Sequence, residues 1–154
     1  MRHLFYILLA LTVSMTAGAQ KADKLYEEGK ALYDSKKYDK AFPKLKAAAE
    51  QGHKKAQYRL GRCYDKGHGV EEDNSTAAQW YQKAALQGSA KAQYQLGKAY
   101  LKGKGVPSDQ QKAREWLLKS VRNKKGGDKV LDKMRGEAKQ GDATAKKMLG
   151  LIGK

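Results

Sequence analysis

Apolar residues recur along this chain at the spacing of amphipathic helices, and short glycine-rich stretches interrupt them. Around Leu60, for example, Ala56, Cys63 and Tyr64 fall within about 60° of one line along a helix that turns by 100° per residue. This alternation of apolar stripes and glycine-marked turns predicts an all-α fold.

The pattern repeats itself after about 36 residues. Residues 56–70 read AQYRLGRCYDKGHGV, and residues 92–106 read AQYQLGKAYLKGKGV. A period of this size is typical of helical-repeat arrays, in which one unit cannot bury its apolar face without a neighbour.

The second copy helps to interpret the stretch 60–73, which gathers a cysteine, a histidine and four carboxylates around a G-x-G sequence. Alanine, leucine and lysine replace Cys63, Asp65 and His68 in the second copy, whereas the leucine, tyrosine and glycines recur. We therefore expect no metal site and place Cys63 in the core, with a zinc site in the first copy alone as an alternative. A phosphate-binding loop is disfavoured because no strand precedes the glycines.

The recurring residues have structural roles that their chemistry suggests. Gly67 and Gly69 suit positive φ where a helix ends and the chain turns. Asp73 and Asp109 suit the N-terminus of the next helix, where a carboxylate accepts hydrogen bonds from free amide groups. We also expect Trp80 and Trp116 to belong to the core between repeats rather than to a ligand site.

A fuller set of residues recurs at fixed spacing. In the first copy it comprises Ala56, Leu60, Gly61, Tyr64, Gly67, Gly69, Val70, Asp73, Ala77, Trp80, Lys83 and Gly88. This pattern resembles the Sel-one-like repeat, a relative of the tetratricopeptide repeat. The resemblance implies a right-handed α-solenoid of antiparallel helix pairs, in a family whose members mostly mediate protein assembly.

The first residues have the features of a secretory signal peptide. An apolar run from Leu4 to Leu11 precedes Ala17-Gly18-Ala19, and the run is shorter than the roughly 20 residues that cross a bilayer. We expect cleavage before Gln20, an exported protein (periplasmic or secreted), and a mature chain without a transmembrane segment.

The rest of the chain is expected to form one helical-repeat domain, residues 20–154. Its predicted parts are a degenerate repeat (22–52), two full repeats (53–88 and 89–123), and an extra helix with a truncated capping repeat (124–154). The extra helix is expected over residues 128–140.

Charge narrows the classes of partner. The chain has 32 Lys and Arg against 16 Asp and Glu, a formal net charge of +16. In an exported protein this balance favours an acidic protein or peptide, or an anionic envelope surface, over nucleic acid. A lysine-rich surface that only confers solubility is the competing interpretation.

The resemblance implies that the first helix of each pair lines a concave surface. The faces opposite Leu60 and Leu96 would then form a basic, tyrosine-bearing groove. The candidate partner-binding residues are Lys55, Tyr58, Arg59, Arg62, Lys91, Tyr94, Gln95 and Lys98.

We therefore predict a non-catalytic protein-interaction or scaffold module of the cell envelope, without a cofactor. One alternative is a binder of anionic lipid or cell-wall polymer. A hydrolase acting on a cell-wall or β-lactam-type substrate is the least favoured. Exported relatives linked to β-lactams carry paired cysteines in each repeat, whereas Cys63 has no partner in this chain.

Overall fold

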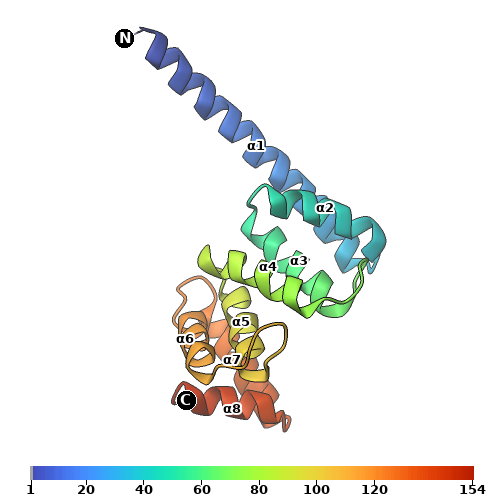
Figure 1. Cartoon of the computed structure of the whole chain (residues 1–154), viewed down its shortest axis with the longest axis vertical. Coiled ribbons are helices and arrows are strands. Elements are labelled where there is room, and N and C mark those ends of the chain that lie inside the picture. The colour runs from blue at the N-terminus through green and yellow to red at the C-terminus, as the bar shows by residue number, and fades with distance from the viewer. Residues whose placement is uncertain (1) are drawn as a thin grey trace.

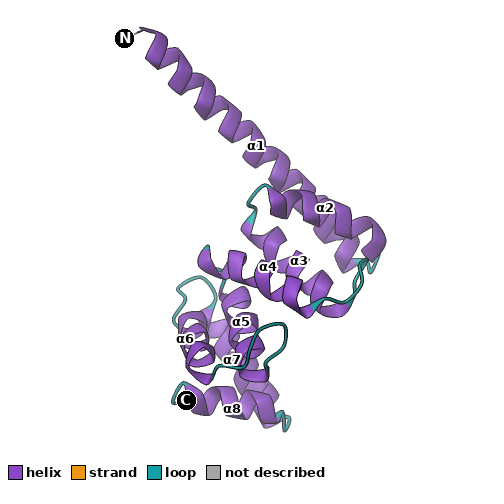
Figure 2. Cartoon of the chain, in the orientation of Figure 1, coloured by secondary structure: helices purple, strands orange, loops and turns teal. Residues whose placement is uncertain are grey.

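The computed structural model describes the backbone of residues 2–154 and the side chains of residues 17–154. These residues form eight helices and no strand (Figure 2). The helices are α1 (Arg2–Asp34), α2 (Tyr38–Glu50), α3 (Lys54–Lys66), α4 (Asn74–Leu86), α5 (Ala90–Lys102), α6 (Gln110–Val121), α7 (Gly127–Lys139) and α8 (Ala143–Leu151). The all-α prediction is confirmed.

The helices form successive antiparallel pairs, α1 with α2, α3 with α4, α5 with α6, and α7 with α8. Figure 1 shows the pairs stacked along one long axis, with the N-terminal part of α1 projecting from one end and the C-terminus at the other. The molecule is therefore an α-solenoid. Its helix α7 occupies the segment in which the sequence predicts an extra helix.

The expected signal segment, residues 1–19, falls largely outside the description. Residue 1 is not described, and side chains are described only from Ala17 onward. Among the residues that the structure describes, no helix combines the length and the apolar character needed to cross a membrane.

The core consists of two larger apolar clusters joined by a smaller one. The first centres on Leu45 and Leu60 between α1, α2, α3 and α4, and the second on Leu117, Met134 and Met148 between α5, α6, α7 and α8. Between them lies a cluster of Ala84, Ala85, Ala92 and Leu96. The small alanine side chains let α4 and α5 approach closely, so the two halves form a continuous stack.

The two G-x-G turns end one helix and fix it to the preceding repeat. Gly67 ends α3 with φ of 64° and Gly69 has φ of 73°, as predicted, and Gly103 ends α5 in the same way with φ of 66°. The second glycine of each turn has another role. A Cβ on Gly69 would overlap the backbone carbonyl of Tyr38, and one on Gly105 would overlap that of Asn74. Only glycine allows the turn to lie against the first residue of α2 or of α4.

The predicted helix caps are confirmed. Asp73 Oδ1 accepts a hydrogen bond from the Thr76 amide at 3.0 Å, and Asp109 Oδ1 accepts one from the Lys112 amide at 2.9 Å. The pKa of the Asp73 carboxyl is lowered chiefly because the Thr76 hydroxyl also donates to Asp73 Oδ2 at 2.6 Å, and then because of the amide hydrogen bond. The pKa of the Asp109 carboxyl is lowered chiefly by the hydrogen bond from the Lys112 amide.

His53 is a cap that the sequence analysis did not identify. Its Nδ1 accepts a hydrogen bond from the Ala56 amide at 3.1 Å, its Nε2 lies 3.2 Å from Asp23 Oδ1, and its ring stacks on Tyr26. Burial lowers the pKa of His53 below its ordinary value of 6.5, although the charge of Asp23 opposes this effect. Burial likewise lowers the pKa of His68.

The lowered pKa values of these two histidines predict that the free energy of unfolding depends on pH. Because the folded protein favours neutral imidazoles, the unfolded chain binds protons more tightly. Their contribution to stability should therefore be complete above pH 6.5 and be lost as the pH falls through the lower folded-state pKa values. Urea unfolding at pH 7.5 and 5.5 measures the loss. A His53→Asn variant keeps a capping side chain without the titration, so an undiminished loss in that variant would rule out His53 as a contributor.

The two tryptophans lie at the margin of the core rather than inside it. Trp80 packs against the first large cluster and Trp116 against the small cluster between the repeats, but both are only partly buried. Lys83 Nζ lies 4.2 Å from the Trp80 ring centroid, and Lys119 Nζ lies 4.4 Å from that of Trp116. Each ring thus packs against a core cluster but stays partly exposed, with a lysine ammonium group over it.

Candidate functional site

A basic cavity lies between the two central repeats. It has a volume of about 350 Å³ and is lined by α3, α4 and α5, with Lys104 from the following turn and Lys133 from α7. Its cationic side chains are Arg62, Lys66, Lys98, Lys102, Lys104 and Lys133, and its one carboxylate is Asp65. The cavity therefore carries an excess of positive charge.

Four of the eight candidate binding residues meet in this cavity. Tyr58 and Arg62 come from α3, and Gln95 and Lys98 come from α5. These four side chains of α3 and α5 therefore line one cavity.

Three other candidates lie outside it. Arg59 Nη1 is 3.0 Å from Asp34 Oδ1, and Lys55 Nζ lies 5.9 Å from the ring centroid of Tyr26. Both side chains of α3 therefore face α1. Lys91 is exposed and does not line the cavity.

The expectation of an exposed Tyr94 is wrong. Its side chain is 3% exposed, and its hydroxyl donates a hydrogen bond to Glu137 Oε2 of α7 at 2.9 Å. Burial, reinforced by Glu137, raises its pKa. Because α7 covers this face of α5, Tyr94 belongs to the core and cannot anchor a partner.

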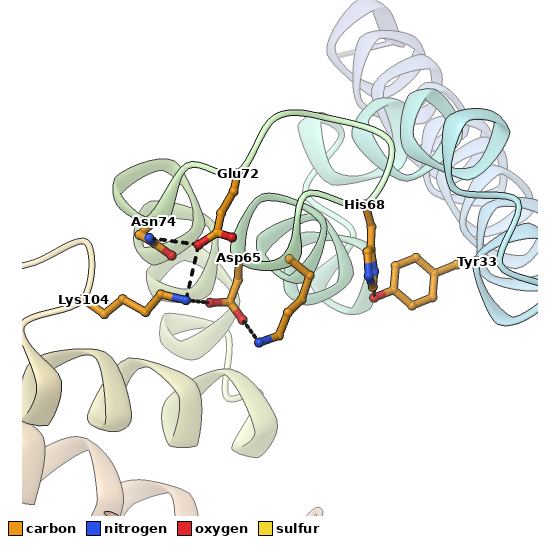
Figure 3. A network of polar contacts seen from close by, with 7 residues as sticks. Tyr33, Asp65, His68, Glu72, Asn74 and Lys104 are labelled. Atoms are coloured by element: carbon orange, nitrogen blue, oxygen red, sulfur yellow. Dashed lines mark hydrogen bonds and ion pairs between the residues drawn. The ribbon is translucent and has the colours of Figure 1, made fainter.

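Three residues that line the cavity, Asp65, Lys66 and Lys104, belong to an ion-pair network that the sequence did not reveal (Figure 3). Lys104 Nζ lies 2.9 Å from Asp65 Oδ1 and 3.6 Å from Glu72 Oε1, and Lys66 Nζ lies 3.6 Å from Asp65 Oδ2. Asp65 and Lys104 occupy positions at which the two copies differ. That divergence was the available signal, but only the structure shows that these residues meet.

Three cations of the cavity remain without an acidic partner. Among the described side chains, no carboxylate lies within ion-pair distance of Arg62, Lys98 or Lys102. Burial lowers the pKa of Lys98, and the charge of Lys102 lowers it further. An incoming anion would relieve this repulsion between like charges.

Two buried glutamines were also missed. Gln57 Nε2 donates to the Ala49 carbonyl and Gln93 Nε2 to the Ala85 carbonyl, each at a junction between repeats. Gln87 and Asn123 then donate to the side-chain oxygens of these glutamines at 2.7 and 3.2 Å. Their recurrence within the A-Q-Y sequence of both copies was the clue to a structural role.

Cys63 and His68, the candidate metal ligands in the stretch 60–73, have different surroundings in the structure. Cys63 is fully buried, whereas His68 stacks on Tyr38 and its Nδ1 lies 2.9 Å from the Tyr33 hydroxyl oxygen. The described side chains, those of residues 17–154, include no group of three His, Cys, Asp or Glu residues able to hold a metal ion.

The Cys63 thiol should be unreactive in the folded protein. Burial raises the pKa of its thiol to about 12, so little thiolate forms near neutral pH. We expect a thiol reagent to label it slowly in the native protein and quickly after unfolding. Rapid native labelling, or zinc that co-purifies with the wild type and is lost in Cys63→Ala, would restore the metal-site interpretation.

The chain is similar in sequence and fold to known helical-repeat proteins. The Sel1 repeat family matches residues 54–89 and 90–124. A crystal structure of a Sel1 repeat protein from Oxalobacter formigenes is 40% identical with a TM-score of 0.52, over 53% of this chain and 62% of that protein.

Two further solved structures are similar. A protective antigen present in uropathogenic Escherichia coli strains, described as displaying an SLR fold, is 27% identical with a TM-score of 0.67, over 86% of this chain and 30% of the antigen. Cysteine-rich protein B of Helicobacter pylori is 25% identical with a TM-score of 0.58, over 72% of this chain and 89% of that protein. The chain thus spans less than two thirds of the first two proteins.

Proposed function

We propose that this chain, in which two Sel1 repeats match residues 54–89 and 90–124, is a non-catalytic interaction module that binds an acidic protein or peptide in the cavity between these repeats. The fold is typical of protein-interaction modules. The observation that carries the finer proposal is the cavity itself, in which six cationic side chains surround one carboxylate.

The cationic side chains without an acidic partner would make the cavity selective for acidic segments. Arg62, Lys98 and Lys102 would attract an acidic segment and hold it by charge-assisted hydrogen bonds. Exposed charges are screened beyond about 8 Å at physiological ionic strength, so the affinity should fall as salt is added. Tyr58, beside Arg62, supplies an aromatic contact surface.

Affinity capture with the full chain tests the proposal. The wild-type protein, immobilised and exposed to a cell-envelope extract, should retain a specific partner. The double variant Arg62→Glu with Lys98→Glu should lose it, because the reversed charges repel an acidic segment.

The matched control is Lys124→Glu with Lys125→Glu. It changes the net charge equally, on exposed residues of the loop before α7. Retention of the partner by the control alone supports the cavity. Equal loss from both double variants would show that bulk charge attracts the partner, and the cavity assignment would then be abandoned.

The net charge of +16 favours one second candidate, an anionic lipid or cell-wall polymer. Co-sedimentation with vesicles of 30% phosphatidylglycerol distinguishes the two functions. A lipid binder should sediment with the vesicles at physiological salt and respond alike to both double variants, whereas a cavity-specific peptide binder should remain in the supernatant.

We also propose that the protein acts outside the cytoplasm. This location rests on the apolar run Leu4–Leu11 and the Ala17-Gly18-Ala19 sequence that follows it. Mass spectrometry of the protein from its native cells should find Gln20 at the mature N-terminus. An intact Met1 would refute export by this signal.

A further inference from the structure

The proposed export removes residues 1–19 and leaves Gln20 as the first residue of the mature chain. Helix α1 runs without a break from Arg2 to Asp34, so the cut falls inside it. Ala22 and Tyr26, in the part that remains, are buried, and this part packs against α2. The mature helix therefore begins at Gln20.

The Gln20 side chain is accessible and free to turn toward its own α-amine. It is exposed, and it precedes Ala22, the first buried position among the described side chains. The N-terminal part of α1 projects away from the other helices (Figure 1). Attack of the α-amine nitrogen on the side-chain carbon Cδ of the same glutamine closes an unstrained five-membered ring. Because both groups belong to one residue, the reaction has the advantage of an intramolecular step.

The charge at the start of the mature helix favours this reaction. The N-terminal end of a helix carries partial positive charge, because its first amide groups lack acceptors. Lys21 and Lys24 add positive charge beside it, and the carboxylate of Asp23 already lies 3.2 Å from His53 Nε2. These charges disfavour an ammonium group at Gln20. They favour the neutral amine, which is the nucleophilic form, and an uncharged product.

We propose that Gln20 of the mature protein is converted to pyroglutamate. A bond forms between the α-amine nitrogen and Cδ, and the bond between Cδ and Nε2 breaks. The leaving nitrogen takes up one proton from the amine and departs as ammonia, and no co-reactant is consumed. The lactam ring has the size of a proline ring, which the first turn of a helix tolerates. This inference rests on the proposed location outside the cytoplasm, and it adds that the exported chain has an uncharged, blocked N-terminus.

Labelling of amines tests the inference on the protein from its native cells. The protein is reductively dimethylated before digestion, so that a free α-amine at Gln20 takes the label and a lactam does not. Cleavage after Glu27 then gives a short N-terminal peptide for tandem mass spectrometry. Its major form should begin at position 20, lack the label at its N-terminus and be lighter by one ammonia. A pyroglutamyl aminopeptidase should remove its first residue.

Gln20→Asn is the matched control. Its side chain keeps the amide but is shorter by one methylene, so attack by the α-amine would close a strained four-membered ring. The exported variant should therefore take the label at its α-amine. A terminus that is unlabelled and lighter by one ammonia in this variant as well would overturn the assignment to ring closure by the Gln20 side chain.

The remaining outcomes separate this inference from the proposals on which it rests. A labelled Gln20 as the major form would overturn the inference and leave the proposed export standing. An intact Met1, or a mature chain that begins at another residue, would overturn both the inference and the cut before Gln20. None of these results concerns the cavity between the repeats, so the proposed interaction module stands or falls by its own experiment.

Discussion

A Gly105→Ala variant should unfold at much lower denaturant than the wild type, with a loss of about 3–5 kcal/mol in the free energy of unfolding. Gly105 has φ of 75°, and an added Cβ would overlap the carbonyl of Asn74 and lie 2.9 Å from the Ser75 amide nitrogen. The cost combines left-handed backbone strain with overpacking against backbone atoms, which cannot rotate away. Urea unfolding of both proteins at one pH measures the difference.

Gly103→Ala is the internal control. Its φ of 66° is similar, but the nearest atom to an added Cβ, Ser108 Cβ, lies 3.4 Å away. Only the left-handed strain remains, so a loss of about 1–2 kcal/mol is expected. Equal losses in the two variants would mean that the second glycine of the turn does not fix one repeat to the next.

The second large effect is expected from Trp116→Ala, at about 2–3 kcal/mol. A fully buried tryptophan costs roughly 3–5 kcal/mol when it is cut to alanine, and the partial exposure of Trp116 reduces this figure. The variant loses contact with the cluster that joins the repeats and the lysine contact on its ring. Urea unfolding measures the loss.

A binding measurement distinguishes a structural role of Trp116 from direct contact with a ligand. Trp116 does not line the cavity, so Trp116→Ala should bind the partner normally at temperatures at which it remains folded. Full stability with lost binding would show instead that Trp116 contacts a ligand.

The features that follow from sequence are those that both copies share. The glycines at 67 and 103 end helices, and Asp73 and Asp109 cap the next ones, because local backbone chemistry decides both roles. Comparison of the copies also placed Cys63 in the core, since alanine replaces it in the second copy. In these cases the reasoning needed only one helix and its turn.

The features that sequence did not reveal depend on a neighbouring helix. Tyr94 was expected to face a partner, but α7 covers it, and α7 lies in the part of the chain outside the repeat pattern. The Asp65–Lys104 pair joins residues at which the copies differ, and that difference marks the two positions without showing that their side chains meet. Helical projection places side chains on one helix but does not show which helix will pack beside them.

Site-specific photocrosslinking tests most directly whether the partner occupies the cavity. A photoreactive amino acid at Gln95, which lines the cavity, is compared with the same group at Gln82, which is exposed on α4 outside it. In cells that express the full chain, irradiation should join one specific acidic protein to the Gln95 variant and not to the Gln82 variant. The same adducts from both positions, or an adduct from Gln82 alone, would contradict the assignment of function to this cavity.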